Sequence, residues 1–216
     1  MTKYNHIIFD LDGTLTNPYN GVFNSLQFAL QQMSYPTIPD ELPAAFIGPP
    51  LQKSFSEIYG MNKKQTDIAV EYFRQYYGRA GLYENELYEG ISELLENLTE
   101  SGMHVYVATS KLEKYARLVL EHFELDKYLK DMSGADYGGQ STKTELIQRI
   151  IDKYQLDQNE VVMIGDTAFD LIGANNCNID SIAVGYGYGT DGVLQQHRPT
   201  YFVRSVEDLA DLFFGL

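Results

Sequence analysis

Short apolar runs recur along the chain, and several of them end on a polar residue. They lie at residues 4–10, 103–109, 161–166 and 181–185, and the first three end on Asp10, Thr109 and Asp166. Runs of this length, apolar at nearly every position, are typical of strands that are buried on both faces of a sheet.

Helical patterns separate these runs. Apolar residues recur at intervals of three and four within residues 91–100, 112–123, 144–153 and 168–176. Strands that alternate with helices predict an α/β fold, a Rossmann-like parallel sheet flanked by helices. Because ligands of such sheets bind at the carboxyl ends of the strands, we expect Asp10, Thr109 and Asp166 to converge at one edge.

The pattern changes between the first run and the rest of the predicted sheet. Helical stretches at 22–33, 51–59 and 65–77 follow one another without a strand-like run, and several prolines, including those of Gly48-Pro49-Pro50, interrupt them. This segment predicts an inserted all-α unit. We expect a core of residues 1–16 and 84–216 and a helical cap of residues 17–83.

The net charge and the cysteine content indicate which partners and which cellular compartment to expect. The chain has 216 residues and a formal net charge of −14, which would repel the backbone of nucleic acid and, equally, a phosphorylated substrate. Phosphate chemistry here would need a local cation. With Cys177 as the single cysteine, and neither a signal-peptide pattern nor a run long enough to span a bilayer, we expect a cytoplasmic protein without a membrane partner.

The segment 10–14, Asp-Leu-Asp-Gly-Thr, places several candidate functional side chains together at the end of the first run. Two carboxylates two residues apart are by themselves most often solvated turn residues. A second acidic signal argues against that interpretation, because Asp166 ends another predicted strand and Asp170 lies one helical turn later on the same face. We therefore expect three or four acids in one crevice.

Such a cluster needs a cation or must stay partly protonated. Two carboxylates ~4 Å apart at an effective dielectric constant of 20 repel each other by about 4 kcal/mol. A bound cation is the simpler solution, and oxygen ligands favour a hard ion such as Mg²⁺, which also binds substrate phosphate. The cofactor that we expect is Mg²⁺.

The predicted crevice also contains hydrogen-bond donors for a phosphate. Thr109, Ser110 and Lys111 offer two hydroxyls and an ammonium just after the second run. Lys143 begins a predicted helix, where the helix dipole disfavours a cation, so its side chain is better explained by a nearby anion.

Together these motifs resemble the haloacid dehalogenase superfamily of phosphohydrolases. The resemblance rests on four motifs in order: the 10–14 segment, Thr109 with Ser110, the isolated Lys143, and the Gly-Asp-x-x-x-Asp segment 165–170. The helical insertion lies between the first two motifs, where the small-cap subgroup places its lid.

The resemblance implies roles for these residues. Asp10 would be the nucleophile that forms an aspartyl-phosphate, and Asp12 would protonate the leaving alcohol and then activate water. Mg²⁺ would be held by the Asp10 carboxylate, the Asp12 carbonyl and Asp166, with support from Asp170. Thr109 and Lys143 would orient the phosphoryl group. Substrate contacts are expected from Gly13, Thr14, Ser110, Lys111, Gly48 and Pro49.

Within the superfamily, residues 46–51 and 81–85 resemble the phosphoglycolate phosphatase and 5′-nucleotidase-like branch. The expected function is therefore Mg²⁺-dependent hydrolysis of a small phosphorylated metabolite, such as 2-phosphoglycolate, a nucleoside monophosphate, a sugar phosphate or pyrophosphate. We expect a monomer or a weak homodimer.

Other functions remain open at this point. A phosphotransferase or phosphomutase would keep every motif and change only the acceptor, and a phospho-receiver or binding protein would use the same acidic site without turnover. A dehalogenase needs no second aspartate. Residues 185–189, Gly-Tyr-Gly-Tyr-Gly, lack the context of a dinucleotide site and are interpreted as a flexible loop near the crevice.

Overall fold

The protein is described by a computed structural model that covers residues 3–36, 41, 46–48, 50–137 and 141–215. It divides into two compact units. The first consists of Met1–Asn17 with Leu87–Leu216, and the second is Pro18–Glu86. The chain therefore leaves the first unit after Asn17 and returns to it at Leu87.

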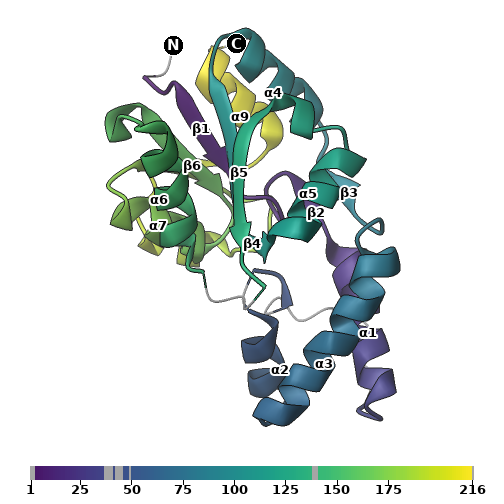
Figure 1. Ribbon diagram of the computed structural model, residues 1–216. Coiled ribbons are helices and arrows are strands. Elements are labelled where there is room, and N and C mark those ends of the chain that lie inside the picture. Colours follow the sequence, from purple (N-terminus) through teal and green to yellow (C-terminus); the bar gives the residue numbers. More distant parts are fainter. Residues whose placement is uncertain (1–2, 37–40, 42–45, 49, 138–140, 216) are drawn as a thin grey trace. The chain divides into compact units, whose positions relative to one another are not determined.

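A parallel sheet forms the centre of the first unit. Among the described residues it has six strands in the order β5-β4-β1-β6-β7-β8 (Figure 1). The strands are β1 His6–Phe9, β4 His104–Leu112, β5 Leu129–Ala135, β6 Val161–Gly165, β7 Asp180–Val184 and β8 Tyr201–Val203. This confirms the predicted α/β class.

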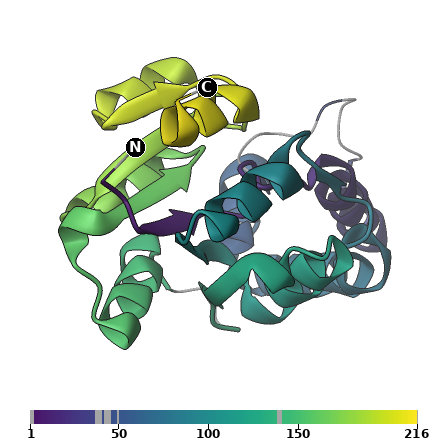
Figure 2. The same ribbon diagram turned by 90° about the horizontal axis from the view of Figure 1, so that it is seen from above.

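Helices cover both faces of this sheet. Figure 1 shows α6 and α7 on one face and α4, α5 and α9 on the other, as right-handed crossovers require. In Figure 2 the yellow C-terminal segment lies at one edge of this unit and the teal segment at the other, with purple β1 between them. The helices of this unit are α4 Ile91–Glu100, α5 Glu113–His122, α6 Lys143–Tyr154, α7 Ala168–Asn176, α8 Asp191–Gln196 and α9 Val206–Phe214, with 3₁₀ turns at Asp126–Tyr128 and Gln158–Glu160.

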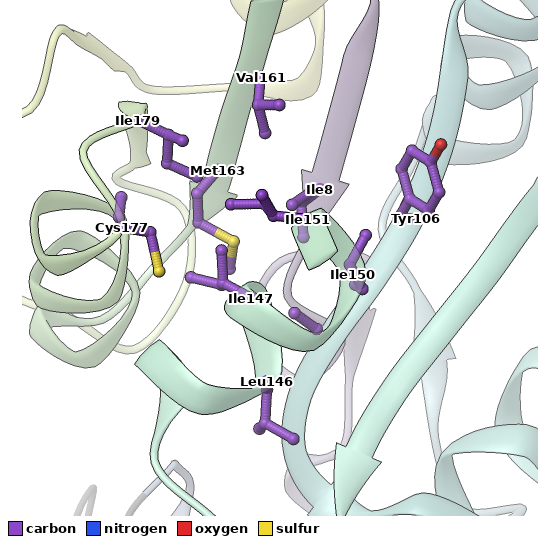
Figure 3. Packing of buried hydrophobic residues seen from close by; sticks show 12 residues of the cluster. Ile8, Tyr106, Leu146, Ile147, Ile150, Ile151, Val161, Met163, Cys177 and Ile179 are labelled. Atoms are coloured by element: carbon purple, nitrogen blue, oxygen red, sulfur yellow. The ribbon is translucent and has the colours of Figure 1, made fainter. Parts of the chain in front are cut away.

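A hydrophobic cluster fixes the central strands against α6 and α7. Along α6, Leu146, Ile147, Ile150 and Ile151 belong to the same cluster as Ile8, Val161 and Met163 of the sheet. Figure 3 shows Ile147 and Ile151 beside Met163 and Ile8. Each fully buried aliphatic side chain of this kind stabilises the fold by roughly 1.5–3 kcal/mol. The strands that carry the site are thus packed against α6 and α7.

Two strands of the six-stranded sheet, β5 and β8, are absent from the sequence-based prediction. Both are edge strands, and their polar and exposed positions interrupt the apolar pattern that a central strand shows. Pairing with one neighbour, rather than burial on both faces, defines them.

The second unit is helical, as predicted for the insertion. It contains α1 Tyr19–Gln32, α2 Leu51–Tyr59, α3 Lys63–Tyr76 and a π-helical turn at Tyr77–Gly81. A short ribbon of β2, Thr16–Asn17, and β3, Glu86–Leu87, contains both chain connections between the units. Within the described segments, none of the helices combines the length and apolar character needed to cross a bilayer.

Close backbone contact in the second unit makes Gly21 a testable position. A Cβ atom on Gly21 of α1 would lie 1.9 Å from the carbonyl oxygen of Gly81. We expect Gly21→Ala to lower the free energy of unfolding by about 1–3 kcal/mol, because overpacking outweighs the ~1 kcal/mol gain in helix propensity. Urea denaturation measures this change.

Gly192→Ala is the matched control. Gly192 lies in α8, and a Cβ atom there meets nothing within 4 Å, so alanine should leave stability unchanged or raise it by up to about 1 kcal/mol. A Gly21→Ala variant as stable as this control would contradict the proposed packing.

Candidate active site

The candidate nucleophile Asp10 directly follows β1, next to the point where the strand order reverses. Its backbone N–H donates to the carbonyl oxygen of Ile164 at 2.9 Å, which continues the β1–β6 pairing past Phe9. Thr109 lies in β4 and Asp166 follows β6, on either side of β1. The predicted convergence of strand ends is therefore present in the fold.

Three buried carboxylates form a cluster at this edge. Asp10, Asp166 and Asp170 each place an oxygen within 4.8 Å of the others, and no second group of this kind occurs among the residues that the structure describes. Asp166 and Asp170 are both fully buried. The fourth predicted acid, Asp12, is not a member of this cluster.

Lys143 lies between two of these acids. Its Nζ is 2.8 Å from Oδ1 of Asp10 and 2.8 Å from Oδ1 of Asp170, and it donates to the carbonyl oxygen of Ala108 at 2.9 Å. Burial alone would lower the pKa of Lys143, but the charges of Asp10 and Asp170 outweigh it and raise that pKa. Lys143 begins α6 and faces two carboxylates, in agreement with the prediction that a lysine at this helix start lies near an anion.

The two oxygens of Asp10 differ in their partners. Oδ1 accepts a hydrogen bond from the backbone N–H of Leu11 at 2.7 Å and pairs with Lys143, whereas Oδ2 has no partner among the described residues. Burial, together with the charge of Asp170, raises the pKa of Asp10 to about 6 against the opposing effect of Lys143. The carboxylate is thus held in place through one of its two oxygens.

Asp166 is held by groups from two loops. The hydroxyl of Thr14 donates to Oδ1 at 3.1 Å, and the backbone N–H of Tyr188 donates to Oδ2 at 2.8 Å. Burial, then the charges of Asp170 and Asp10, raise the pKa of Asp166 to about 8.

Asp170 is held by the start of its own helix. Its Oδ2 accepts from the N–H and the hydroxyl of Thr167, at 3.0 and 2.8 Å, in the capping box of α7. This leaves Oδ1 for Lys143.

The donor set fits a hard divalent cation. Three buried carboxylates face a single ammonium, so the cluster has an excess of negative charge, and burial has raised the pKa of two of its members. A divalent ion held by carboxylate oxygens would remove that excess. Oxygen-only ligation of this kind suits Mg²⁺ better than a softer metal.

Asp12 has a different partner. Nζ of Lys111 lies 2.8 and 2.6 Å from its two carboxylate oxygens, so Lys111, expected at the substrate phosphate, here pairs with the candidate acid. Thr109 is buried, and its hydroxyl accepts from the backbone N–H of Lys111 at 3.2 Å, while Ser110 is exposed.

The structure explains why position 13 of the 10–14 segment is a glycine. Its φ is +88°, and a Cβ atom there would lie 2.2 Å from Oδ2 of Asp166. A side chain at this position would therefore enter the acid cluster itself.

Comparison with known proteins identifies the family. The model of the haloacid dehalogenase-like hydrolase family matches residues 7–184. The chain belongs to this family. It is 41% identical to a 5′-nucleotidase of Pseudomonas aeruginosa over 93% of this chain and 91% of that protein.

Two further relatives of this hydrolase are informative. A Mycobacterium tuberculosis protein named tyrosine-protein kinase PtkA is 33% identical over 85% of this chain but 62% of its own length. The crystal structure of a predicted phosphatase from Clostridium acetobutylicum has a TM-score of 0.91 and 36% identity, covering 99% of both chains. The family and the names of its phosphatase relatives confirm the expected enzyme class, a phosphoric monoester hydrolase.

The sequence-based prediction treated one contributor to this hydrolase site only as a nearby loop. Residues 185–189 pack against Asp166, and the N–H of Tyr188 is one of its two hydrogen-bond donors. A signal for this was present in three glycines spaced by two, which permit close backbone approach. Of the predicted cap contacts, Gly48 lies in the second unit with φ +100°, and Pro49 lies outside the described residues.

Proposed function

We propose that this hydrolase removes phosphate from small phosphate monoesters, with nucleoside 5′-monophosphates as the first candidates and 2-phosphoglycolate as the second. The observation that carries the proposal is the Asp10 carboxylate, held by Oδ1 in a buried cluster of acids with Oδ2 available. The name of the Pseudomonas aeruginosa relative, a 5′-nucleotidase at 41% identity, supports the choice of substrate.

Mg²⁺ is the proposed cofactor. The carboxylates of Asp10 and Asp166 and the carbonyl of Asp12 would hold it, and Asp170 would support them through Lys143 and Thr167. When bound, the ion supplies positive charge to the oxygens of the substrate phosphate.

The proposed reaction has two steps. Oδ2 of Asp10 attacks phosphorus, the bond to the ester oxygen breaks, and Asp12 gives its proton to the departing alcohol. Asp12 then takes a proton from water, whose oxygen attacks the phosphorus of the aspartyl-phosphate. The bond between phosphorus and Oδ2 breaks, which releases inorganic phosphate, regenerates the Asp10 carboxylate and leaves Asp12 protonated for the next turnover. Lys143 keeps Asp10 oriented throughout.

The remaining predicted contacts complete the proposal. Gly13 and Thr14 adjoin Asp166, and they would bind the phosphoryl oxygens together with Thr109 and Ser110. Lys111 pairs with Asp12, and from this position it would also contribute its positive charge to the binding of the phosphoryl group. The helical unit would act as a cap that contacts the leaving group, with Gly48 and Pro49 in that role.

A substrate panel tests this function. Release of inorganic phosphate would be measured with nucleoside 5′-monophosphates, 2-phosphoglycolate, a hexose phosphate and pyrophosphate, each with and without Mg²⁺. Highest kcat/KM for a nucleoside 5′-monophosphate would support the proposal, and equal rates with and without enzyme for every ester would overturn it.

Removal of divalent ions should abolish activity. We expect a chelator to lower kcat/KM by at least about 10²-fold, because the excess negative charge of the acid cluster would then face the substrate phosphate. Excess Mg²⁺ should restore the rate. Full activity after exhaustive chelation, with the metal content checked by mass spectrometry, would contradict the assignment of Mg²⁺.

Phosphoryl transfer is a second candidate function, favoured by the Mycobacterium tuberculosis relative named a tyrosine-protein kinase. It requires the same residues and a different acceptor. Transfer of labelled phosphate from ATP to a tyrosine-containing peptide, in the absence of appreciable phosphate release from monoesters, would favour it over hydrolysis.

A further inference from the structure

The 185–189 loop packs directly on the acid cluster. A Cβ atom on Gly187 would lie 2.3 Å from Cβ of Asp166 and 2.3 Å from the carbonyl oxygen of Gly13. A Cβ atom on Gly189 would lie 2.0 Å from the carbonyl oxygen of Asp166. The backbone of the loop therefore fits against Asp166 only because these two positions have no side chain.

Tyr188 links Asp166 to the end of β2. Its backbone N–H donates to Oδ2 of Asp166 at 2.8 Å, and its phenol hydroxyl donates to Oδ1 of Asn17. Asn17 is the last residue of the first unit before the chain enters the helical insertion. One residue thus contacts both a proposed metal ligand and the outgoing connection.

Tyr186 contacts the segment before β2 through its hydroxyl and the returning connection through its ring. Its hydroxyl donates to the carbonyl oxygen of Thr14 at 3.0 Å, and its ring meets that of Tyr88 edge-on with centroids 5.0 Å apart. Tyr88 follows Leu87, where the chain returns, and its N–H donates to the carbonyl oxygen of Leu15 at 3.2 Å. Burial raises the pKa of Tyr186, so its hydroxyl remains a donor.

We propose that residues 185–189 hold the β2–β3 ribbon at a fixed distance from Asp166, and that Tyr186 and Tyr188 are positioning residues for substrate binding. Both chain connections to the helical unit are in that ribbon. The proposal rests on the proposed function, in which the helical unit contacts the substrate. Neither hydroxyl touches a reacting group, so their removal should affect binding more than chemistry.

Removal of the hydroxyls provides the first test. For Tyr188→Phe and Tyr186→Phe we expect KM for a nucleoside 5′-monophosphate to rise about 5- to 20-fold, which is the effect of a lost buried hydrogen bond, with kcat changed less than about 2-fold. With acetyl phosphate, which has almost no leaving group for the helical unit to contact, KM should stay within about 2-fold. Tyr201→Phe, an exposed tyrosine of β8, is the matched control and should change neither.

Hydrogen exchange provides a readout that is independent of activity. In Tyr188→Phe the peptides that contain Asn17 and Leu87 should exchange at least about 5-fold faster than in the wild type, because the ribbon loses a contact that holds it closed. The Tyr201→Phe control should exchange like the wild type.

Gly187→Ala tests the contact of the same loop with Asp166 and Gly13. Its Cβ atom would push the loop away from Asp166 and Gly13, so we expect the affinity for Mg²⁺, measured by calorimetry without substrate, to fall at least about 5-fold. Gly192→Ala, which meets nothing within 4 Å, should bind Mg²⁺ like the wild type.

The outcomes separate this inference from its alternatives. Unchanged KM and unchanged ribbon exchange in both tyrosine variants would overturn it, as would an equal fall in kcat with both substrates, the mark of a merely structural role. A wild-type protein that releases no phosphate would instead overturn the proposed function. The hydrogen exchange of the ribbon and the affinity for Mg²⁺ would still decide whether the loop holds the β2–β3 ribbon against Asp166.

Discussion

Asp10→Asn should abolish turnover, lowering kcat by at least about 10³-fold, while the fold is retained. An amide is no nucleophile toward phosphorus, so the oxygen that forms the aspartyl-phosphate is lost. Asparagine has the same shape, and its Oδ1 can still accept from the N–H of Leu11. It also removes one charge from a cluster that has an excess of negative charge, so stability without metal should not fall.

Phosphate release under saturating substrate would measure the loss, and rapid quenching with mass spectrometry would look for the phosphorylated peptide that contains residue 10. Asp211→Asn, an exposed aspartate of α9, is the matched control and should keep wild-type activity. A variant at position 10 with more than about a tenth of wild-type kcat would contradict the assignment of the nucleophile.

Lys143→Met should damage both stability and activity. The ammonium pairs with Asp10 and Asp170 at 2.8 Å, and its removal leaves buried carboxylates without their cation. Breaking a buried ion pair by removing one partner typically costs about 3–5 kcal/mol. We also expect kcat/KM to fall at least about 10²-fold, because Asp10 loses the contact that orients it and the phosphoryl group loses a nearby positive charge.

Denaturant unfolding and phosphate release would measure the two effects. Lys153→Met is the control, because Lys153 lies on the same helix in an exposed pair with Asp131 at 2.6 Å, and its loss should leave stability close to that of the wild type. Asp170→Asn added to Lys143→Met should restore part of the stability by removing an uncompensated charge. No recovery in the double variant would show that packing, rather than charge, explains the loss.

Part of the active site was predictable because the central strands are buried on both faces. Continuous apolar runs end where the sheet ends, so Asp10 and Asp166 could be placed at one edge from their positions after such runs. The position of Lys143 near an anion was predictable for a different reason. A cation at a helix start conflicts with the helix dipole unless an anion is nearby.

Other contacts had no local signal. The pairing of Lys111 with Asp12 spans 99 positions and depends on where the end of β4 meets the turn after β1. The hydroxyl contacts of Tyr186 and Tyr188 span more than 170 positions, and nothing in a Gly-Tyr alternation indicates a partner. Edge strands β5 and β8 were missed because pairing, not burial, defines them.

The amino-acid sequence alone determined the α/β class, the helical insertion and the residues that deliver carboxylates to one edge, because burial periodicity and helix-end electrostatics are local properties of a chain. Only the tertiary structure decided which oxygen of Asp10 is available, which acid Lys111 pairs with, and that the 185–189 loop joins Asp166 to the β2–β3 ribbon. Those features depend on distances of a few ångströms between segments far apart in the chain, and such distances exist only after the core has packed.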